Sequence, residues 1–260
     1  MRLILGAGFT GARVAELARE RGEDVLAVVR SEARAQALRA RGIPVTREPV
    51  ANVARELAAP DVHAIVCFPP DGETDSVLAP LLAAAGAVSY VSTTGVYGEL
   101  EGTIDDTTNV PAGDSLRLRA ESAYLAVGGT VLRPPGIYGP DRGLHIRVKS
   151  GLHSIPGDGA NITSRIHVHD LAMLLLASRA VHGDTFVVAD LDPMPQREII
   201  EWICAEYGYP MPPSVPPAEV HETLRRNRRI DPRRALSVLG VTLQYPSYKD
   251  GMRPLPSRHI

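Results

Sequence analysis

Six residues near the start of the chain could do chemistry, the pattern Gly6-Ala7-Gly8-Phe9-Thr10-Gly11. An apolar run precedes this pattern and an amphipathic stretch follows it, so the glycines lie at a predicted strand-to-helix turn. Gly6 permits a tight turn, Gly8 lets backbone N–H groups approach a pyrophosphate, and Gly11 lets the helix pack close to the strand. The N-terminus of that helix would face the phosphates with its partial positive charge. The pattern predicts dinucleotide binding, with a purely structural glycine turn as the alternative.

The end of the second predicted strand indicates which dinucleotide. NAD-preferring sites commonly carry Asp or Glu about 20 residues after the glycines, where the carboxylate binds the ribose hydroxyls. This chain has Arg30 at that position, followed by Ser31. Ser31 can contribute a hydroxyl group to the site and is expected to begin the next helix. Because a guanidinium can pair with a 2′-phosphate, we expect NADP(H) to be favoured over NAD(H). The alternative is that Arg30 is only an exposed charge at a strand end.

The elements that must position these residues alternate through the first half of the chain. Strands are predicted at Leu3–Leu5, Asp24–Val29, Ile43–Thr46, Val62–Phe68, Ala87–Ser92 and Thr130–Leu132. Helices are predicted at Gly11–Arg21, Glu32–Arg41, Val50–Ala58, Thr74–Ala85 and Asp114–Val127. This alternation is typical of a parallel sheet with helices on both faces. The predicted fold class is α/β, a Rossmann-type doubly wound parallel sheet with a small C-terminal substrate lobe.

Beyond Arg133 the pattern changes, because prolines and glycines interrupt it. Helices are predicted at Asp170–Ala180, Pro195–Tyr207, Glu219–Arg229 and Asp231–Leu239, with a strand at Thr185–Ala189 and an irregular stretch at Gly151–Gly159. We expect residues 1–140 and 184–207 to form the dinucleotide-binding domain. Residues 141–183 and 208–260 would form the small lobe, which a proline-rich connector at 209–217 helps to position.

Composition excludes several classes of partner. The chain has 260 residues, of which 44% are hydrophobic and 22% charged, as expected for one globular unit with a sizeable core. The net charge of −2 gives no indication of a nucleic-acid or membrane-surface partner. A strand that begins at Arg2 leaves no room for a signal peptide, so we expect a cytoplasmic protein with Cys67 and Cys204 as free thiols. No metal-ligand spacing occurs, and a homodimer is left open.

Later motifs resemble one family. They are Val91-Ser92-Thr93-Thr94-Gly95-Val96-Tyr97-Gly98, Leu132-Arg133-Pro134-Pro135-Gly136-Ile137-Tyr138-Gly139-Pro140 and Arg165-Ile166-His167-Val168-His169-Asp170-Leu171-Ala172. With the glycine turn, they make the chain similar to the extended and atypical short-chain dehydrogenase/reductases, also called the NAD-dependent epimerase/dehydratase family. The resemblance spans nearly the whole chain. It implies a nicotinamide cofactor and a small polar substrate, for which a nucleotide sugar is one candidate.

The resemblance also implies catalytic residues, of which this chain keeps only some. The family uses a Ser or Thr together with Tyr-x-x-x-Lys, in which the tyrosine exchanges a proton with substrate and the lysine holds the ribose. Thr93 falls in the Ser/Thr place. Arg117 falls in the lysine place and Gly113 in the tyrosine place, so the usual acid is missing. Tyr245 and Lys249 repeat the spacing, but Pro246 fits a helix interior poorly, and we expect that match to be accidental.

Two other tyrosines, Tyr97 and Tyr138, could replace the missing acid. The alternative is that both tyrosines only pack in the core. The predicted catalytic set is therefore Thr93, Tyr97 and Tyr138. The cofactor-binding prediction comprises Gly6, Gly8, Phe9, Thr10, Gly11, Arg30, Ser31, Phe68, Pro69, Arg117, Pro134 and Ile137. Two functions stay open: an atypical oxidoreductase or nucleotide-sugar epimerase or dehydratase, and a non-catalytic NADP(H)-binding sensor or regulator.

Several charged residues are expected to play simpler roles. Asp105 and Asp106 are expected to be solvated turn residues, and the cluster Arg225–Arg229 a solvated face. Asp170 is predicted to cap its helix, and His167 and His169 to alternate along a strand. Arg142, Arg147 and Arg165 are either contacts for a diphosphate or plain exposed charges.

Overall fold

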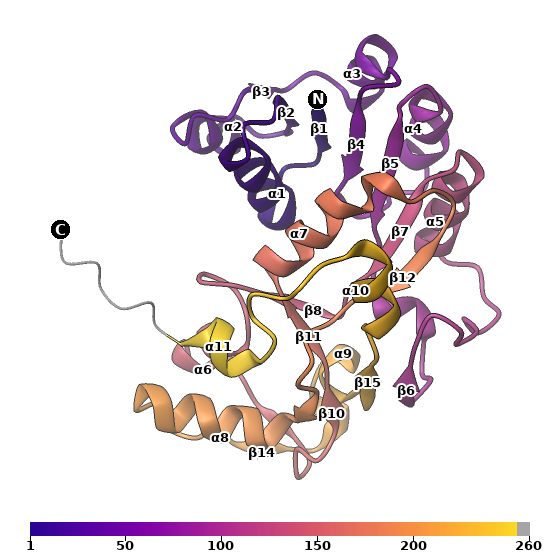
Figure 1. Ribbon diagram of the computed structural model, residues 1–260. Helices are drawn as coiled ribbons and strands as arrows, with labels where there is room; N and C mark the ends of the chain where they lie inside the picture. The colour runs from indigo at the N-terminus through magenta and orange to yellow at the C-terminus, as the bar shows by residue number, and fades with distance from the viewer. Residues whose placement is uncertain (254–260) are drawn as a thin grey trace.

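A seven-stranded parallel sheet forms the centre of the protein, in a computed structural model that describes residues 1–253 (Figure 1). Its order is β12-β7-β5-β4-β1-β2-β3. The strands are β1 (Arg2–Leu5), β2 (Val25–Val28), β3 (Val45–Thr46), β4 (His63–Val66), β5 (Ala87–Val91), β7 (Thr130–Arg133) and β12 (Thr185–Val187). The winding direction reverses between β1 and β4, which is where doubly wound sheets open a crevice for a ligand. The predicted fold class is confirmed.

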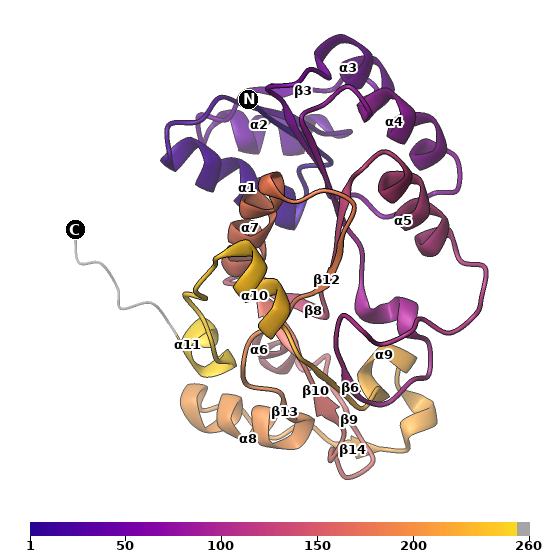
Figure 2. The same ribbon diagram turned by 45° about the vertical axis from the view of Figure 1, so that its right-hand side comes forward.

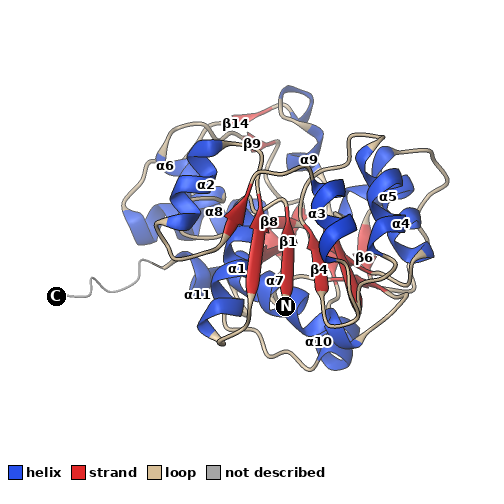
Figure 3. Cartoon of the chain, turned by 90° about the horizontal axis from the view of Figure 1, so that it is seen from above, coloured by secondary structure: helices blue, strands red, loops and turns tan. Residues whose placement is uncertain are grey.

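Helices cover both faces of this sheet (Figure 3). On one face lie α1 (Phe9–Glu20), α2 (Glu32–Arg39), α7 (Val168–Ala177) and α10 (Arg233–Leu239), and on the other α3 (Val50–Leu57), α4 (Thr74–Leu82) and α5 (Leu116–Ala126). Because strand side chains alternate, Ile4 packs into the first core while Leu3 and Leu5 pack into the second. Burial on both faces explains why the central strands are nearly continuous apolar runs.

A smaller lobe lies beyond the carboxyl ends of the central strands (Figures 1 and 2). Its ladders pair β6 (Gly102–Ile104) with β15 (Arg228–Ile230), β8 (Gly136–Tyr138) with β11 (Arg165–His167), β9 (Ile155–Pro156) with β14 (Ser214–Val215), and β10 (Ile162–Thr163) with β13 (Met194–Pro195). Its helices are α6 (Leu144–Lys149), α8 (Gln196–Tyr207), α9 (Glu222–Arg225) and α11 (Tyr248–Met252), and the short turns η1 (Thr94–Tyr97), η2 (Ser178–Ala180) and η3 (Pro217–Glu219) complete the described elements. Residues 254–260 of the predicted lobe lie outside the described residues.

Two helices pack with a different unit from the one the sequence predicts. Helix α7, predicted in the lobe, packs along α1 and contributes Leu171, Leu174 and Leu175 to the core on that face of the sheet. Helix α8, predicted in the dinucleotide domain, packs on α6, and Ile199 and Ile203 join the separate core of the lobe. Periodicity reveals that a helix has an apolar face, but it does not say which neighbour covers that face.

Three local predictions in the second half are wrong. The predicted helix Glu219–Arg229 is instead η3, α9 and the strand β15. His167 ends β11 and caps α7, since its Nδ1 accepts a hydrogen bond from the backbone N–H of His169 (3.2 Å), so His169 lies in the first turn of a helix. Asp170 does not cap that helix, because its carboxylate accepts from the backbone N–H groups of Gln244 (2.8 Å) and Tyr245 (2.9 Å). A strand that runs directly into a helix leaves too few residues for alternation to be diagnostic.

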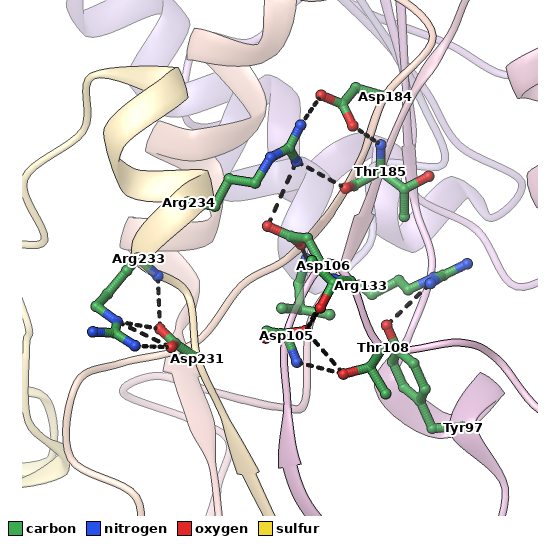
Figure 4. Close-up of polar contacts among 12 residues, drawn as sticks. Tyr97, Asp105, Asp106, Thr108, Arg133, Asp184, Thr185, Asp231, Arg233 and Arg234 are labelled. Carbon is green, nitrogen blue, oxygen red and sulfur yellow. Dashed lines mark hydrogen bonds and ion pairs between the residues drawn. The ribbon is translucent and has the colours of Figure 1, made fainter.

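Two sets of charges predicted to be solvated are partly built into the structure. Arg228 is buried, and its guanidinium donates to the backbone carbonyls of Thr94 (2.8 Å), Leu100 (2.6 Å) and Gly98. Asp106 has a side chain only 5% exposed, which accepts from the backbone N–H of Val187 (2.6 Å) and pairs with Arg234 (Figure 4). These groups join the lobe to the sheet.

Cys67 and Cys204 are free thiols, as predicted.

A chain of buried polar side chains crosses the amino ends of the central strands. The Arg2 guanidinium lies 2.6 Å from Nδ1 of His63, and Nε2 of His63 lies 2.7 Å from the Ser89 hydroxyl. Ser89 contacts the Ser178 hydroxyl at 2.7 Å, which donates to the carbonyl of Leu175 (2.8 Å). Since arginine can only donate, Nδ1 accepts, and the ring is neutral with its proton on Nε2. Burial lowers the pKa of His63 to about 3, and the positive charge of Arg2 is the second cause of this shift.

This neutral histidine predicts a loss of stability in acid. The pKa of His63 is lowered from 6.5 in the unfolded chain to about 3 in the fold, so below pH 6.5 the unfolded state binds the extra proton. His63 alone should cost about 1.4 kcal/mol of the free energy of unfolding for each pH unit between roughly 6 and 4. Urea titrations across this range measure the slope. His63→Gln should make the slope shallower and the exposed control His221→Gln should not; equal slopes in both variants would contradict the assignment.

Candidate functional site

The glycines of the β1–α1 turn have different structural reasons to be glycine. Gly6 has φ +87°, and a Cβ there would lie 3.0 Å from Cβ of Phe68. A Cβ on Gly11 would lie 2.9 Å from the carbonyl oxygen of Gly6 and 3.0 Å from Cγ2 of Ile4. A Cβ on Gly8 would come no closer than 4.0 Å to any neighbour. The fold therefore requires Gly6 and Gly11, whereas Gly8 leaves space beside the backbone that the protein does not itself fill.

The start of α1 is arranged to accept an anion. Gly8 stands at the N-cap and offers no side-chain acceptor, and the first turn carries no acidic residue. An uncapped first turn presents backbone N–H groups with the positive end of the helix dipole behind them. Thr10 and Gly11 are buried behind the turn, while the half-buried ring of Phe9 packs under the Arg142 guanidinium, 5.2 Å from its centroid.

A cavity of about 790 Å³ opens from this turn along the carboxyl ends of β1, β2 and β4. Gly6, Gly8, Arg30, Ser31, Phe68 and Pro69 of the predicted cofactor set line it. The predicted residues Phe9, Thr10, Gly11, Arg117, Pro134 and Ile137 are not part of its lining. The cavity thus brings together the glycine turn and the end of β2, which the sequence separates by about twenty residues.

The far end of the cavity is basic. Ser31 caps α2, accepting from the backbone N–H of Arg34 at 3.3 Å, and Arg30, Arg34 and Arg47 all line this end. The sequence interpretation missed Arg34 and Arg47. Each had a signal: Arg34 lies in the first turn of the helix that Ser31 caps, and Arg47 directly follows β3, the neighbour of β2 in this sheet.

Thr93 lies at the carboxyl end of β5, where it is half-buried and caps η1 by accepting from the backbone N–H of Gly95 (3.0 Å). Arg117 reaches the same strand end, because its Nη1 donates to the hydroxyl of Tyr90 (3.0 Å) and to the carbonyl of Val91 (3.3 Å). Gly113 precedes α5, whose N-cap is Ser115, and is exposed. The places of the hydroxyl and the lysine are therefore both occupied at this strand end, but the tyrosine place lies outside the helix.

Beneath Thr93 lies a buried ion pair. Glu121 accepts two hydrogen bonds from Arg133, at 3.0 and 2.6 Å, and a third from the hydroxyl of Ser92. Arg133 also donates to the hydroxyl of Tyr97 at 3.1 Å, a contact shown in Figure 4. Tyr97 is fully buried, and this burial raises the pKa of its hydroxyl. Within this network, the hydroxyl groups of Ser92 and Tyr97 both have hydrogen-bond partners inside the protein.

Tyr138 is also buried, with 2% of its surface exposed. Its hydroxyl donates to the carbonyl of Ser247 at 3.4 Å, and burial raises the pKa of this hydroxyl far above its usual range. Thr93, Tyr97 and Tyr138 do not line the cavity described above. Large aromatic rings in a cleft-forming loop tend to be drawn into the core, since burying them removes much apolar surface from water.

The remaining candidates have structural partners. Tyr245 and Lys249 do not share a helix, because α11 begins at Tyr248, so the spacing is accidental as predicted. Arg165 is not an exposed charge: it is buried beside the Tyr248 ring, and its Nη2 donates to the carbonyl and hydroxyl of Thr163. Within residues 1–253, no group of three or more His, Cys, Asp or Glu side chains is placed to hold a metal ion.

Comparison with known proteins places this geometry in context. No protein-family model matches the chain. A 3-diazoavenalumate denitrifying reductase from a Streptomyces species is 30% identical over 145 residues, which are 48% of this chain and 46% of that protein. The chain thus matches about half the length of this curated relative.

Solved structures cover nearly the whole chain. A conserved protein of unknown function from Silicibacter pomeroyi has a TM-score of 0.82 and 29% identity, covering 96% of this chain and 95% of that one. A UDP-glucose 4-epimerase from Thermotoga maritima, solved with UDP-glucose, gives 0.77 at 19% identity, covering 96% of each chain. The human epimerase family protein SDR39U1, solved with NADPH, gives 0.73 at 19% identity, covering 96% of this chain and 97% of that one. The predicted resemblance is confirmed in fold: the chain has the Rossmann-type fold of epimerases and short-chain dehydrogenase/reductases.

In the part of the chain that is described, no helix has the length and apolarity to cross a membrane.

The different surroundings of the glycines predict different effects of adding a methyl group. Gly8→Ala should change the free energy of unfolding by less than about 0.5 kcal/mol, because its Cβ meets open space. Gly11→Ala should lower it by about 1–3 kcal/mol, because Gly6 and Ile4 must move. Urea denaturation without any nucleotide measures both, and a larger loss for Gly8→Ala than for Gly11→Ala would contradict this account of the turn.

Proposed function

We propose that this chain binds NADP(H) and acts as an atypical short-chain dehydrogenase/reductase. One observation carries the proposal: a single cavity joins an uncapped, glycine-lined helix start to a serine-capped, arginine-rich helix start about twenty residues later. The first suits a pyrophosphate and the second a 2′-phosphate. The NADPH in the human structure and the reductase activity named for the Streptomyces relative support the assignment.

Each predicted residue has a place in this proposal. Gly6 and Gly11 shape the turn, and Gly8, with the backbone of Phe9 and Thr10, would receive the pyrophosphate. Arg30 and Ser31 would hold the 2′-phosphate, and Phe68 and Pro69 form the opposite wall of the cavity. Arg117, Pro134 and Ile137 lie beyond the cavity, on α5 and around β8, and would face the nicotinamide half.

In the proposed reaction, the cofactor supplies or accepts a hydride and this chain's residues place the substrate. The Thr93 hydroxyl would hold the reacting oxygen of a small polar substrate at the end of β5. Arg117 would hold the nicotinamide ribose with its fixed charge, but it cannot exchange a proton at neutral pH. Since Tyr97 and Tyr138 are buried, we assign the proton to water or to a group on the substrate. A nucleotide sugar is one substrate candidate, because the Thermotoga structure holds UDP-glucose. A sugar epimerase or dehydratase activity is therefore proposed beside simple reduction.

A non-catalytic NADP(H) sensor is the second candidate. The observation that favours it is the structure of the proton-transfer half: Gly113 fills the tyrosine place, and the hydroxyls of Tyr97 and Tyr138 are engaged in the interior. A protein with an intact nucleotide half and no accessible acid could report the redox state of the cofactor without turning over. The cytoplasmic location and a homodimer stay predictions under either function.

Arg30→Asp tests the assignment of the cofactor. A carboxylate at the end of β2 would repel a 2′-phosphate, so NADPH affinity should fall by about 10-fold or more while NADH affinity stays the same or rises. Enhancement of NADPH fluorescence on binding measures the first, and competition measures the second. Arg19→Asp, the same substitution at an exposed arginine outside the cavity, is the matched control. Equal NADPH affinity in wild type and Arg30→Asp would contradict the proposal.

Thr93→Val separates the two functions. For an enzyme, kcat with any substrate that oxidises NADPH, followed by absorbance of the reduced nicotinamide, should fall about 100-fold while NADPH affinity is unchanged. Thr93→Ser should retain most of the activity. A kcat that Thr93→Val leaves intact would contradict the role given to Thr93, and tight NADPH binding without turnover across sugar nucleotides and small carbonyl compounds would favour the sensor.

A further inference from the structure

The basic end of the cavity holds more positive charge than the end of β2 alone provides. We propose that Arg34 and Arg47 complete, with Arg30, a three-guanidinium site for the phosphomonoester of a 2′-phosphorylated adenosine, and that Glu32 positions Arg47 for this task. The inference rests on the proposed function and deepens it. It assigns two specificity-determining residues and one positioning residue.

The sheet brings Arg47 to this site from a separate element. Strand β3 pairs with β2 in parallel register, with Thr46 opposite Val28, so the residues that follow both strands emerge side by side. Nε of Arg47 donates to the backbone carbonyl of Arg30 at 3.3 Å. This contact ties the segment after β3 to the residue predicted to bind the phosphate, and both side chains line the cavity.

Glu32, which does not line the cavity, forms an ion pair with the guanidinium of Arg47. One carboxylate oxygen of Glu32 accepts from Nη1 of Arg47 at 3.2 Å, and the other accepts from Nη1 of Arg39 at 3.1 Å. Glu32 and Arg39 are not part of the cavity lining, whereas Arg47 is. The two arginines share the single charge of Glu32, so the carboxylate orients Arg47 without fully neutralising it. Nη2 of Arg47 has no hydrogen-bond acceptor among residues 1–253.

The other two guanidinium groups are available to a ligand. Within residues 1–253, the side chains of Arg30 and Arg34 make no hydrogen bond or ion pair, although both line the cavity. Arg34 lies in the first turn of α2, whose positive dipole end faces the same space. A guanidinium pairs with phosphate oxygens through parallel hydrogen bonds, so three arginines that line one end of a cavity match the several acceptor oxygens of a phosphomonoester.

The charge balance of the cavity also fits a dianion. Beside these three arginines, its lining includes two carboxylates, Glu48 and Asp71. Asp71 follows β4, and its carboxylate is engaged with the backbone N–H groups of Glu73 and Thr74 and with the Thr74 hydroxyl. At the β2–β3 side, three positive charges face the single carboxylate of Glu48. A phosphomonoester, which carries about −1.5 to −2 charges at pH 7, would bring this side close to neutrality.

The test uses nucleotide fragments, which report on this end of the cavity without the nicotinamide. Calorimetric titrations with 2′,5′-ADP and with 5′-AMP give the dissociation constants for the wild type and for Arg34→Gln, Arg47→Gln and the control Arg19→Gln. Wild type should bind 2′,5′-ADP more tightly than 5′-AMP. Arg34→Gln and Arg47→Gln should each weaken 2′,5′-ADP by about 10-fold or more, as expected for a lost charge-assisted hydrogen bond, with little change for 5′-AMP. Arg19→Gln, at an exposed arginine of α1 that does not line the cavity, carries the same change of charge and should stay within about twofold.

Further variants and outcomes define failure. Arg47→Lys keeps the charge but not the fork and should recover part of the affinity. Glu32→Gln should weaken 2′,5′-ADP less than Arg47→Gln does, and an unchanged melting temperature shows that the variants are folded. Equal losses in Arg47→Gln and Arg19→Gln, or equal losses of both fragments, would overturn the inference in favour of diffuse electrostatics. If wild type binds 2′,5′-ADP tightly and Arg47→Gln leaves it unchanged, Arg47 is wrongly assigned while the proposed function stands. A wild type that binds neither fragment overturns both.

Discussion

The close approach of α1 to β1 is the constraint on which the rest of the molecule depends. With any side chain larger than hydrogen at Gly11, the helix would collide with the carbonyl of Gly6 and with Ile4. Packed this closely, α1 starts directly at the carboxyl end of the central strand and points its first turn into the crevice at the winding reversal. Helix α7 then packs along α1, and the loop at Gln244 and Tyr245 is fastened to α7 through Asp170. The position of the lobe thus derives from the same turn.

The two halves of the candidate site obey different physical rules. In the nucleotide half, an uncapped helix start and the side chains of Arg30, Arg34 and Arg47 line a cavity, which suits the binding of an anion. In the half around Thr93, Glu121 accepts hydrogen bonds from Ser92 and Arg133, and Arg133 also donates one to the hydroxyl of Tyr97. A buried ion pair of this kind fixes geometry but offers no proton to a substrate. The molecule therefore combines an open cavity at the carboxyl ends of β1, β2 and β4 with a buried polar network at the end of β5.

Sequence patterns predicted the first half of the chain well, because each strand and helix there is defined by its own periodicity. Local rules alone predicted Ser31 as a helix start, Gly6 as a turn residue and Gly11 as a close-packing position. The lobe was predicted poorly, since its strands contain two or three residues and depend on partners far away in the chain, as β15 does on β6. Arg228 and Asp106 looked like surface charges for the same reason: their partners are backbone groups that only the fold brings near. Arg47 was missed because its role depends on the adjacency of two strands, not on its neighbours in sequence.

The most direct test of the central claim is a calorimetric titration of the wild-type protein with NADPH and, separately, with NADH. The account predicts one site per chain, with NADPH bound at least about 10-fold more tightly than NADH, because only the 2′-phosphate reaches the arginines at the end of β2. Binding of NADH with equal or greater affinity would contradict the cofactor assignment, and the absence of binding to either would contradict the proposed function as a whole.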